Sequence, residues 1–150
     1  MESNYKIHEV MTHNVTSIDL NSTILEISKN MAEKAIGSVL IIQNEKPVGI
    51  ITEQDVVRKV VASGKDAKTI RAKDIMSKNL ISINSQEDLY QAVVAMSNSS
   101  IKHLPVIDNN KLVGIITSKD IVRLEPHLIE MLTFKSSLSN EEAKKLFDKL

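Results

Sequence analysis

The sequence carries the same pattern twice. Residues 10–58 align with residues 75–123 without a gap, and many paired positions are identical. The run VGIIT occurs at residues 48–52 and again at residues 113–117, and an Asp follows each run at the same distance. An ungapped match of this length indicates two copies of one supersecondary unit. Because one such unit would leave apolar surface exposed, we expect the two copies to pack together.

Each copy has the pattern of a strand, a helix, two strands and a second helix. Residues 15–18 and 80–83 are predicted as short extended segments. The helix that follows has an apolar stripe at helical spacing, with N-cap candidates at residues 21–23 in the first copy and at Ser85 in the second. The stripes consist of Ile24, Ile27 and Met31 in the first copy, and of Leu89, Val93 and Met96 in the second.

Two apolar strands and a helix complete each copy. The predicted strands are residues 39–42 and 48–52 in the first copy, and residues 104–107 and 113–117 in the second, each pair joined by a polar turn. Because these runs lack polar alternation, we expect both of their faces to be buried. In the first copy the second helix carries the apolar residues Val56, Val57 and Val60.

These patterns predict a mixed α/β (α+β) chain made of two β-α-β-β-α repeats. The expected boundaries are an N-terminal segment at 1–9, repeat 1 at 10–61, a polar linker at 62–74, repeat 2 at 75–125 and a C-terminal helical extension at 126–150. Pro126 is expected to stop the last helix of repeat 2. Within the extension, Ser139 and Glu142 have the spacing of a capping box.

Composition and charge exclude several functions. The chain has 150 residues, no cysteine, and nineteen basic residues against nineteen acidic ones. A net charge of zero makes nucleic acid an unlikely partner, and the absence of cysteine excludes thiolate metal sites. Neither a signal peptide nor a membrane-length apolar run is present, so we expect a cytoplasmic protein without a membrane partner. The scattered histidines and the absence of a nucleophile paired with a base predict neither a metal site nor an enzyme.

The repeated Thr-x-x-Asp sequence has two interpretations that the spacing alone leaves open. Thr52 with Asp55, and Thr117 with Asp120, fit a capping box in which the pair only starts a helix, and Arg58 could then pair with Asp55. Alternatively, a carboxylate one turn into a helix can accept hydrogen bonds from two neighbouring hydroxyls, as in ribose binding. In that interpretation the glycine of VGIIT allows another group to approach the backbone closely.

The two-copy pattern resembles a pair of cystathionine β-synthase (CBS) domains, also called a Bateman module. The resemblance rests on VMTHNVTSI and IMSKNLISI at the starts of the copies, on IKHLPVID in the second copy, and on both VGIIT runs with their following Asp and Arg. It covers residues 10–124. It implies a three-stranded sheet and two helices per copy, a pseudo-two-fold arrangement, two clefts between the copies, and an adenosine-containing ligand such as AMP, ADP, ATP or S-adenosylmethionine.

The resemblance also implies which residues would line each cleft. One cleft would hold the ribose on Thr52 and Asp55, with the adenine near Leu80, Ile81 and Ile101 and the phosphate near Lys102 and His103. The other would combine Thr117 and Asp120 with Val15, Thr16, Ile36, Gly37 and Ser38. Gly37 and Ser38 replace the two cationic residues, and Leu40 replaces Pro105. We therefore expect the cleft with Asp55 to hold phosphate more tightly.

The expected function is that of a regulatory module which binds a small molecule as a ligand, not as a cofactor, and signals to a regulated protein. A homodimer is expected through the helices at residues 21–34 and 85–97, which have apolar residues off their stripes, such as Leu25 and Ala92. The alternative is an interaction or scaffold module without a nucleotide ligand.

Overall fold

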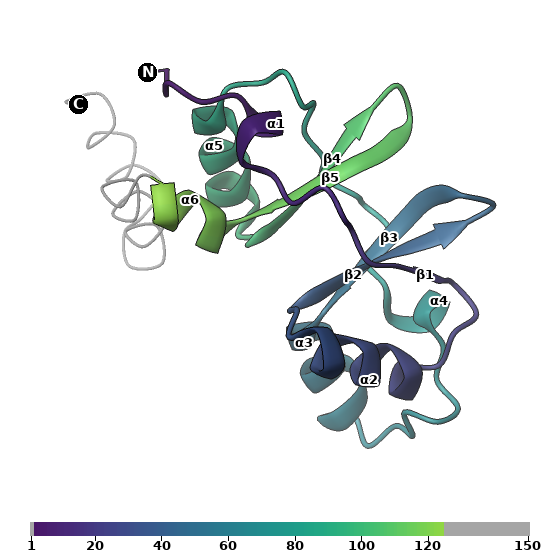
Figure 1. Cartoon of the computed structure of the whole chain (residues 1–150). Coiled ribbons are helices and arrows are strands. Elements are labelled where there is room, and N and C mark those ends of the chain that lie inside the picture. The colour runs from purple at the N-terminus through teal and green to yellow at the C-terminus, as the bar shows by residue number, and fades with distance from the viewer. Residues whose placement is uncertain (1, 125–150) are drawn as a thin grey trace. The chain divides into compact units, whose positions relative to one another are not determined.

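The computed structural model describes residues 2–124, which form two compact units (Figure 1). The first-repeat unit contains residues 13–81 and 107–113. Among the described residues, the second-repeat unit contains residues 2–12, 82–106 and 114–124. Each unit thus includes the segment that precedes the other repeat in the sequence. The predicted C-terminal extension, with Pro126, Ser139 and Glu142, lies outside the described residues.

The first-repeat unit is built on a three-stranded sheet. Its strands are β1 (Ser17–Asp19), β2 (Ser38–Gln43) and β3 (Lys46–Thr52), in the order β1-β2-β3. β1 is parallel to β2, and β2 is antiparallel to β3. Asn44 and Glu45 connect β2 to β3 with φ angles of 50° and 65°, which favours a tight hairpin with the right-handed strand twist.

The helices of the first-repeat unit cover one side of its sheet (Figure 1). They are α2 (Ile24–Lys34), α3 (Glu53–Asp55), the π-helix η1 (Val56–Val61) and α4 (Ala72–Ile75). Thr23 caps α2, because its side chain accepts a hydrogen bond from the Glu26 N–H while the Glu26 carboxylate accepts one from the Thr23 N–H. The predicted stripe is confirmed: its three side chains are buried in a core with those of β2, β3, η1 and α4.

The second helix of repeat 1 carries the three predicted apolar residues, but they are not equally buried. Val60 is 1% exposed and Val56 packs against the core, whereas Val57 is 58% exposed. This segment is a π-helix, in which the Ala62 N–H donates to the Val57 carbonyl at 2.8 Å, five residues back instead of four.

The elements of the second repeat are α1 (Ile7–Val10), α5 (Leu89–Ser99), β4 (His103–Asp108), β5 (Lys111–Thr117) and α6 (Ser118–Leu124). All of them belong to the second-repeat unit except residues 107–113 of the β4–β5 hairpin. β4 and β5 form a two-stranded sheet, and their connection repeats the first hairpin, with positive φ at Asn109 and Asn110. The strand predicted at residues 80–83 was wrong in extent, because it is reduced to one parallel bridge between Ile83 and Val106.

The N-cap predicted at Ser85 was also wrong. The helix starts after Asp88, whose Oδ1 accepts hydrogen bonds from the Tyr90 N–H at 2.8 Å and the Ser3 N–H at 2.9 Å. Ser85 is 5% exposed, and its carbonyl accepts from the His8 N–H, so it anchors the N-terminal segment instead. The repeat alignment pairs Asp88 with Thr23, which is the cap of α2. This pairing could have identified Asp88 as the cap from the sequence.

Burial of the strands is confirmed for the first strand of each hairpin and is wrong for the second. β2 is buried over four consecutive residues and β4 over three, so both faces of these strands are covered. β3 and β5 instead alternate, with Gly49 and Ile51 buried in one and Gly114 and Ile116 in the other. Only one face of each of these strands is fully buried, whereas a continuous apolar run predicts that both faces are.

An extended segment lies along the outer edge of each hairpin. In the first-repeat unit, Ile50 and Ser77 exchange backbone hydrogen bonds of 3.2 and 3.1 Å. In the second-repeat unit, Thr12 and Ile115 do the same at 2.9 and 3.0 Å. The segment expected as a polar linker, residues 62–74, also contributes to the hydrophobic core, because Ala72 near its end is fully buried.

These edge segments explain the glycine of VGIIT. A Cβ added to Gly49 would lie 2.7 Å from the Met76 Sδ and 3.0 Å from the Ser77 carbonyl oxygen. A Cβ on Gly114 would meet the Met11 thioether and the Thr12 carbonyl in the same way. The close approach predicted at the glycine thus occurs, and the group that approaches is a methionine of the chain itself.

Candidate functional site

Thr52 and Asp55 lie where β3 passes into α3. Asp55 Oδ2 accepts hydrogen bonds from the Thr52 N–H at 2.9 Å and from the Thr52 hydroxyl at 3.2 Å. The Asp55 N–H in turn faces Thr52 Oγ1 at 3.4 Å. The capping-box interpretation is therefore confirmed here. Because one carboxylate oxygen makes both cap contacts, the other is directed elsewhere.

Thr117 and Asp120 repeat this geometry where β5 passes into α6. Asp120 Oδ2 accepts from the Thr117 N–H and from the Thr117 hydroxyl, both at 2.8 Å. The Asp120 N–H faces Thr117 Oγ1 at 3.4 Å. Both carboxylates are partly buried and fixed in orientation by their own helix starts. We call the two pairs the Thr52–Asp55 site and the Thr117–Asp120 site.

The two sites differ at the other carboxylate oxygen. Lys59 Nζ forms an ion pair with Asp55 Oδ1 at 2.8 Å and also donates to the Ile75 carbonyl at 2.8 Å. The sequence interpretation considered Arg58, three residues after Asp55, and missed Lys59, which has the spacing of four that suits a helical ion pair. In the repeat alignment Leu124 stands at the position of Lys59. Among the described residues, Asp120 Oδ1 has neither a hydrogen bond nor an ion pair.

Each site lies next to the strand start of its own repeat. The Gly37 carbonyl accepts from the Glu53 N–H at 3.1 Å, and Ser38 pairs with Thr52 in the sheet. In the second-repeat unit the Lys102 carbonyl accepts from the Ser118 N–H at 3.0 Å. The sequence assigned Lys102 and His103 to Asp55, and Gly37 and Ser38 to Asp120. Those combinations draw on both units, so they stay predictions.

The remaining predicted site residues are partly exposed, as ligand contacts need to be. Thr16 lies immediately before β1, where its hydroxyl accepts from Lys34 Nζ at 3.3 Å and its carbonyl accepts from the Leu40 N–H at 3.0 Å. Ile81 is 40% exposed. Half-buried side chains are found at the other four positions, which are Val15, Ile36, Leu80 and Ile101.

Two further features of the described residues bear on function. Over residues 2–124, no helix is long and apolar enough to cross a bilayer. In the same part of the chain, no three His, Asp or Glu side chains gather as a group that could hold a metal ion. His8 has a structural partner, because its Nδ1 lies 3.2 Å from the Ser85 carbonyl.

Comparison with known proteins finds the CBS domain twice in this chain. The CBS domain family model matches residues 7–62 and residues 72–127. A similar curated relative is the uncharacterized protein MK0525 of Methanopyrus kandleri, which is 38% identical over 146 residues. That match covers 96% of this chain and 71% of the relative.

Solved structures of CBS proteins share the fold. The CBS domain pair of protein MJ0100, in complex with 5′-methylthioadenosine and S-adenosyl-L-methionine, is 29% identical, with a TM-score of 0.75. The match covers 82% of this chain and 97% of that one. A hexameric CBS-CP12 protein from bloom-forming cyanobacteria is 32% identical, with a TM-score of 0.74, over 84% of this chain and 73% of that one.

Three observations lead to the same family. They are the duplicated sequence pattern, the mixed α/β architecture with the same hairpin and Thr–Asp pair in each repeat, and the two family matches. This chain belongs to the CBS domain family and carries a tandem CBS pair, which is a regulatory module.

Proposed function

We propose that this chain is a sensor which binds an adenosine-containing ligand at its Thr–Asp sites and regulates a partner protein without catalysing a reaction. AMP, ADP, ATP and S-adenosylmethionine are the ligands considered. The observation that carries the proposal is the twice-built carboxylate, held by two hydrogen bonds on one oxygen. A carboxylate fixed in this way is prepared to accept ribose hydroxyls through its other oxygen.

Two further facts support an adenosine ligand. The MJ0100 CBS pair, which shares 29% of its sequence with this chain, is solved with 5′-methylthioadenosine and S-adenosyl-L-methionine. Both compounds carry a ribose attached to adenine. A carboxylate that receives charge-assisted hydrogen bonds from a ribose contributes more to binding than a neutral acceptor would.

The test compares ligand binding with helix capping. Replacing both Asp55 and Asp120 by Asn should abolish the binding of adenosine, AMP and S-adenosylmethionine in calorimetry, because an amide accepts weaker hydrogen bonds than a carboxylate. The unmodified chain should gain about 2.7 kcal/mol of stability at a ligand concentration one hundred times Kd. The double variant should show no such gain in thermal unfolding.

A matched control separates the two roles of an Asp at a helix start. Asp74 accepts from the Arg71 N–H at 2.9 Å in the capping box of α4, which is not one of the Thr–Asp sites. Asp74→Asn should therefore bind as the unmodified chain does. If the double variant still binds with unchanged affinity, the Thr–Asp pairs only cap helices.

The alternative function, an interaction module without a nucleotide ligand, is favoured by one observation. Val57 and Val61 on η1 are 58% and 68% exposed, and they are four residues apart. Such a spacing places both on one face of the helix. An exposed apolar pair of this kind suits a protein contact.

A further inference from the structure

Lys59 distinguishes two Thr–Asp pairs whose own hydrogen bonds are otherwise the same. The carboxylate, the threonine and their three contacts are the same in both repeats. Only the first repeat has a cation four residues after the aspartate; the second has Leu124, whose side chain carries no charge. A difference in how the two carboxylates accept ligand hydroxyls must therefore be sought first at this position.

Counting the acceptor positions of each carboxylate shows what the difference means for a ligand. A carboxylate oxygen has two lone-pair positions. In both sites Oδ2 has both positions taken by the threonine N–H and hydroxyl. Asp55 Oδ1 already accepts from Lys59, so one position remains. Within the described residues Asp120 Oδ1 has no partner, so both positions remain.

The Lys59 side chain is held in place by two contacts. Its Nζ lies 2.8 Å from Asp55 Oδ1 and 2.8 Å from the Ile75 carbonyl. The Asp55 side chain is 15% exposed and the Lys59 side chain 43%, so water screens the carboxylate end of this ion pair less than the ammonium end. A ligand that needs the second position on Asp55 Oδ1 must displace the Lys59 ammonium, which donates to both Asp55 and the Ile75 carbonyl.

We propose that Lys59 sets the ligand preference of the Thr52–Asp55 site by occupying the position that a second ribose hydroxyl would take. The inference rests on the proposed adenosine-binding function and extends it. The Thr117–Asp120 site accepts both hydroxyls of a cis-diol. The Thr52–Asp55 site accepts one, so it discriminates weakly between a ribose and a 2′-deoxyribose.

The experiment isolates each site in the full-length chain and compares adenosine with 2′-deoxyadenosine by calorimetry. Asp120→Asn leaves the Thr52–Asp55 site, which should bind both nucleosides with similar affinity. Asp55→Asn leaves the Thr117–Asp120 site, which should prefer adenosine by about tenfold, as expected for one hydrogen bond to a charged acceptor.

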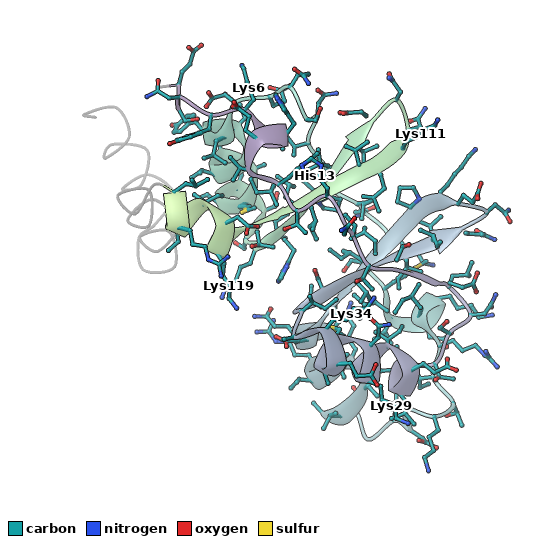
Figure 2. The ribbon with its side chains drawn as sticks, in the orientation of Figure 1. Lys6, His13, Lys29, Lys34, Lys111 and Lys119 are labelled. Carbon is teal, nitrogen blue, oxygen red and sulfur yellow. The ribbon has the colours of Figure 1, made fainter. Side chains whose placement is uncertain are left out.

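Exchanging the residues at positions 59 and 124 should exchange the preferences of the two sites for adenosine over 2′-deoxyadenosine. Lys59→Leu in the Asp120→Asn chain should create a preference for adenosine of about tenfold, and Leu124→Lys in the Asp55→Asn chain should remove the one present there. Lys59→Met, which keeps an unbranched apolar stem, provides a second variant if Lys59→Leu does not fold. Lys29→Leu, on the exposed surface of α2 (Figure 2), removes the same charge from the same unit and should change nothing.

The outcomes separate this inference from the proposed function. An adenosine to 2′-deoxyadenosine ratio that Lys59→Leu and Leu124→Lys both leave unchanged, in chains that do bind adenosine, overturns the role of Lys59 alone. A complete lack of adenosine binding in every chain, the unmodified one included, overturns both. A change in stability without a change in the ratio shows a structural role and also overturns the inference.

Discussion

At the residue scale, the two strand glycines are needed because a methionine lies where their Cβ atoms would be. Gly49→Ala should lower the free energy of unfolding by about 1–3 kcal/mol, the usual cost of overpacking a filled core. The Met76 side chain is the group that would have to move. Chemical denaturation of the single and double variants measures the effect, and Gly49→Ala combined with Met76→Ala should lose less than the sum of the two single losses.

Residue-level prediction succeeded where the relevant contacts are local. The Thr52–Asp55 and Thr117–Asp120 caps span three residues, so their spacing was enough to offer the capping box as one of two interpretations. The role of Gly49 is different, because its neighbour Met76 is brought there by a bridge between distant segments. Lys59 was within reach of the sequence, since a spacing of four on a helix pairs charges as well as a spacing of three does.

At the element scale, the start of α5 depends on one carboxylate. Asp88→Ala should lower the free energy of unfolding by about 1 kcal/mol, because the Tyr90 and Ser3 N–H groups lose their acceptor. Glu87→Ala, at an exposed neighbouring position, should have little effect. Equal losses in the two variants, measured by urea unfolding, would contradict the assignment of Asp88 as the cap.

The stabilisation by Asp88 should depend on pH. Partial burial raises the pKa of Asp88, but hydrogen bonds from Ser3 and Tyr90 together outweigh it and leave the pKa below its ordinary value. A carboxyl with a lowered folded-state pKa stabilises the protein above its unfolded pKa, and this contribution is lost as the pH falls through the folded value. The difference in stability between the unmodified chain and Asp88→Ala should therefore shrink below about pH 4. A difference that is constant from pH 7 to pH 3 would contradict this.

Prediction of the elements was best for helices with a strong stripe and poorest at the ends of strands. The stripe of α2 predicted its buried face, because tertiary packing and helical spacing agree there. In the segment expected as a strand at residues 80–83, only Ile83 pairs with another strand. An apolar run in the sequence does not show over how many residues the pairing extends. The π-helix at η1 was not predictable, because hydrophobic spacing does not distinguish it from an α-helix over six residues.

At the scale of the whole molecule, we expect a homodimer formed through η1. Ala92, which the sequence suggested as part of a dimer surface, is fully buried, so that residue was wrong, whereas Leu25 is half-buried. The exposed pair Val57 and Val61 is a better candidate. Light scattering should give twice the 16.7 kDa of one chain, and Val57→Asp with Val61→Asp should give a monomer. If light scattering gives the mass of a single chain for the unmodified protein at micromolar concentration, the prediction is contradicted.

The exchange of edge segments has a consequence for how the chain folds during its synthesis. The residues of the first-repeat unit up to position 81 leave the ribosome as one continuous stretch, with Met76 included. Residues 2–12, although made first, find their partners only after Glu87, Asp88 and Ile115 have been made. Because domains generally fold as units during translation, the earliest part of the chain should be among the last to become ordered. A fragment cut at the repeat boundary, residues 10–61, would lack the edge that covers Gly49, whereas a fragment of residues 13–81 retains it.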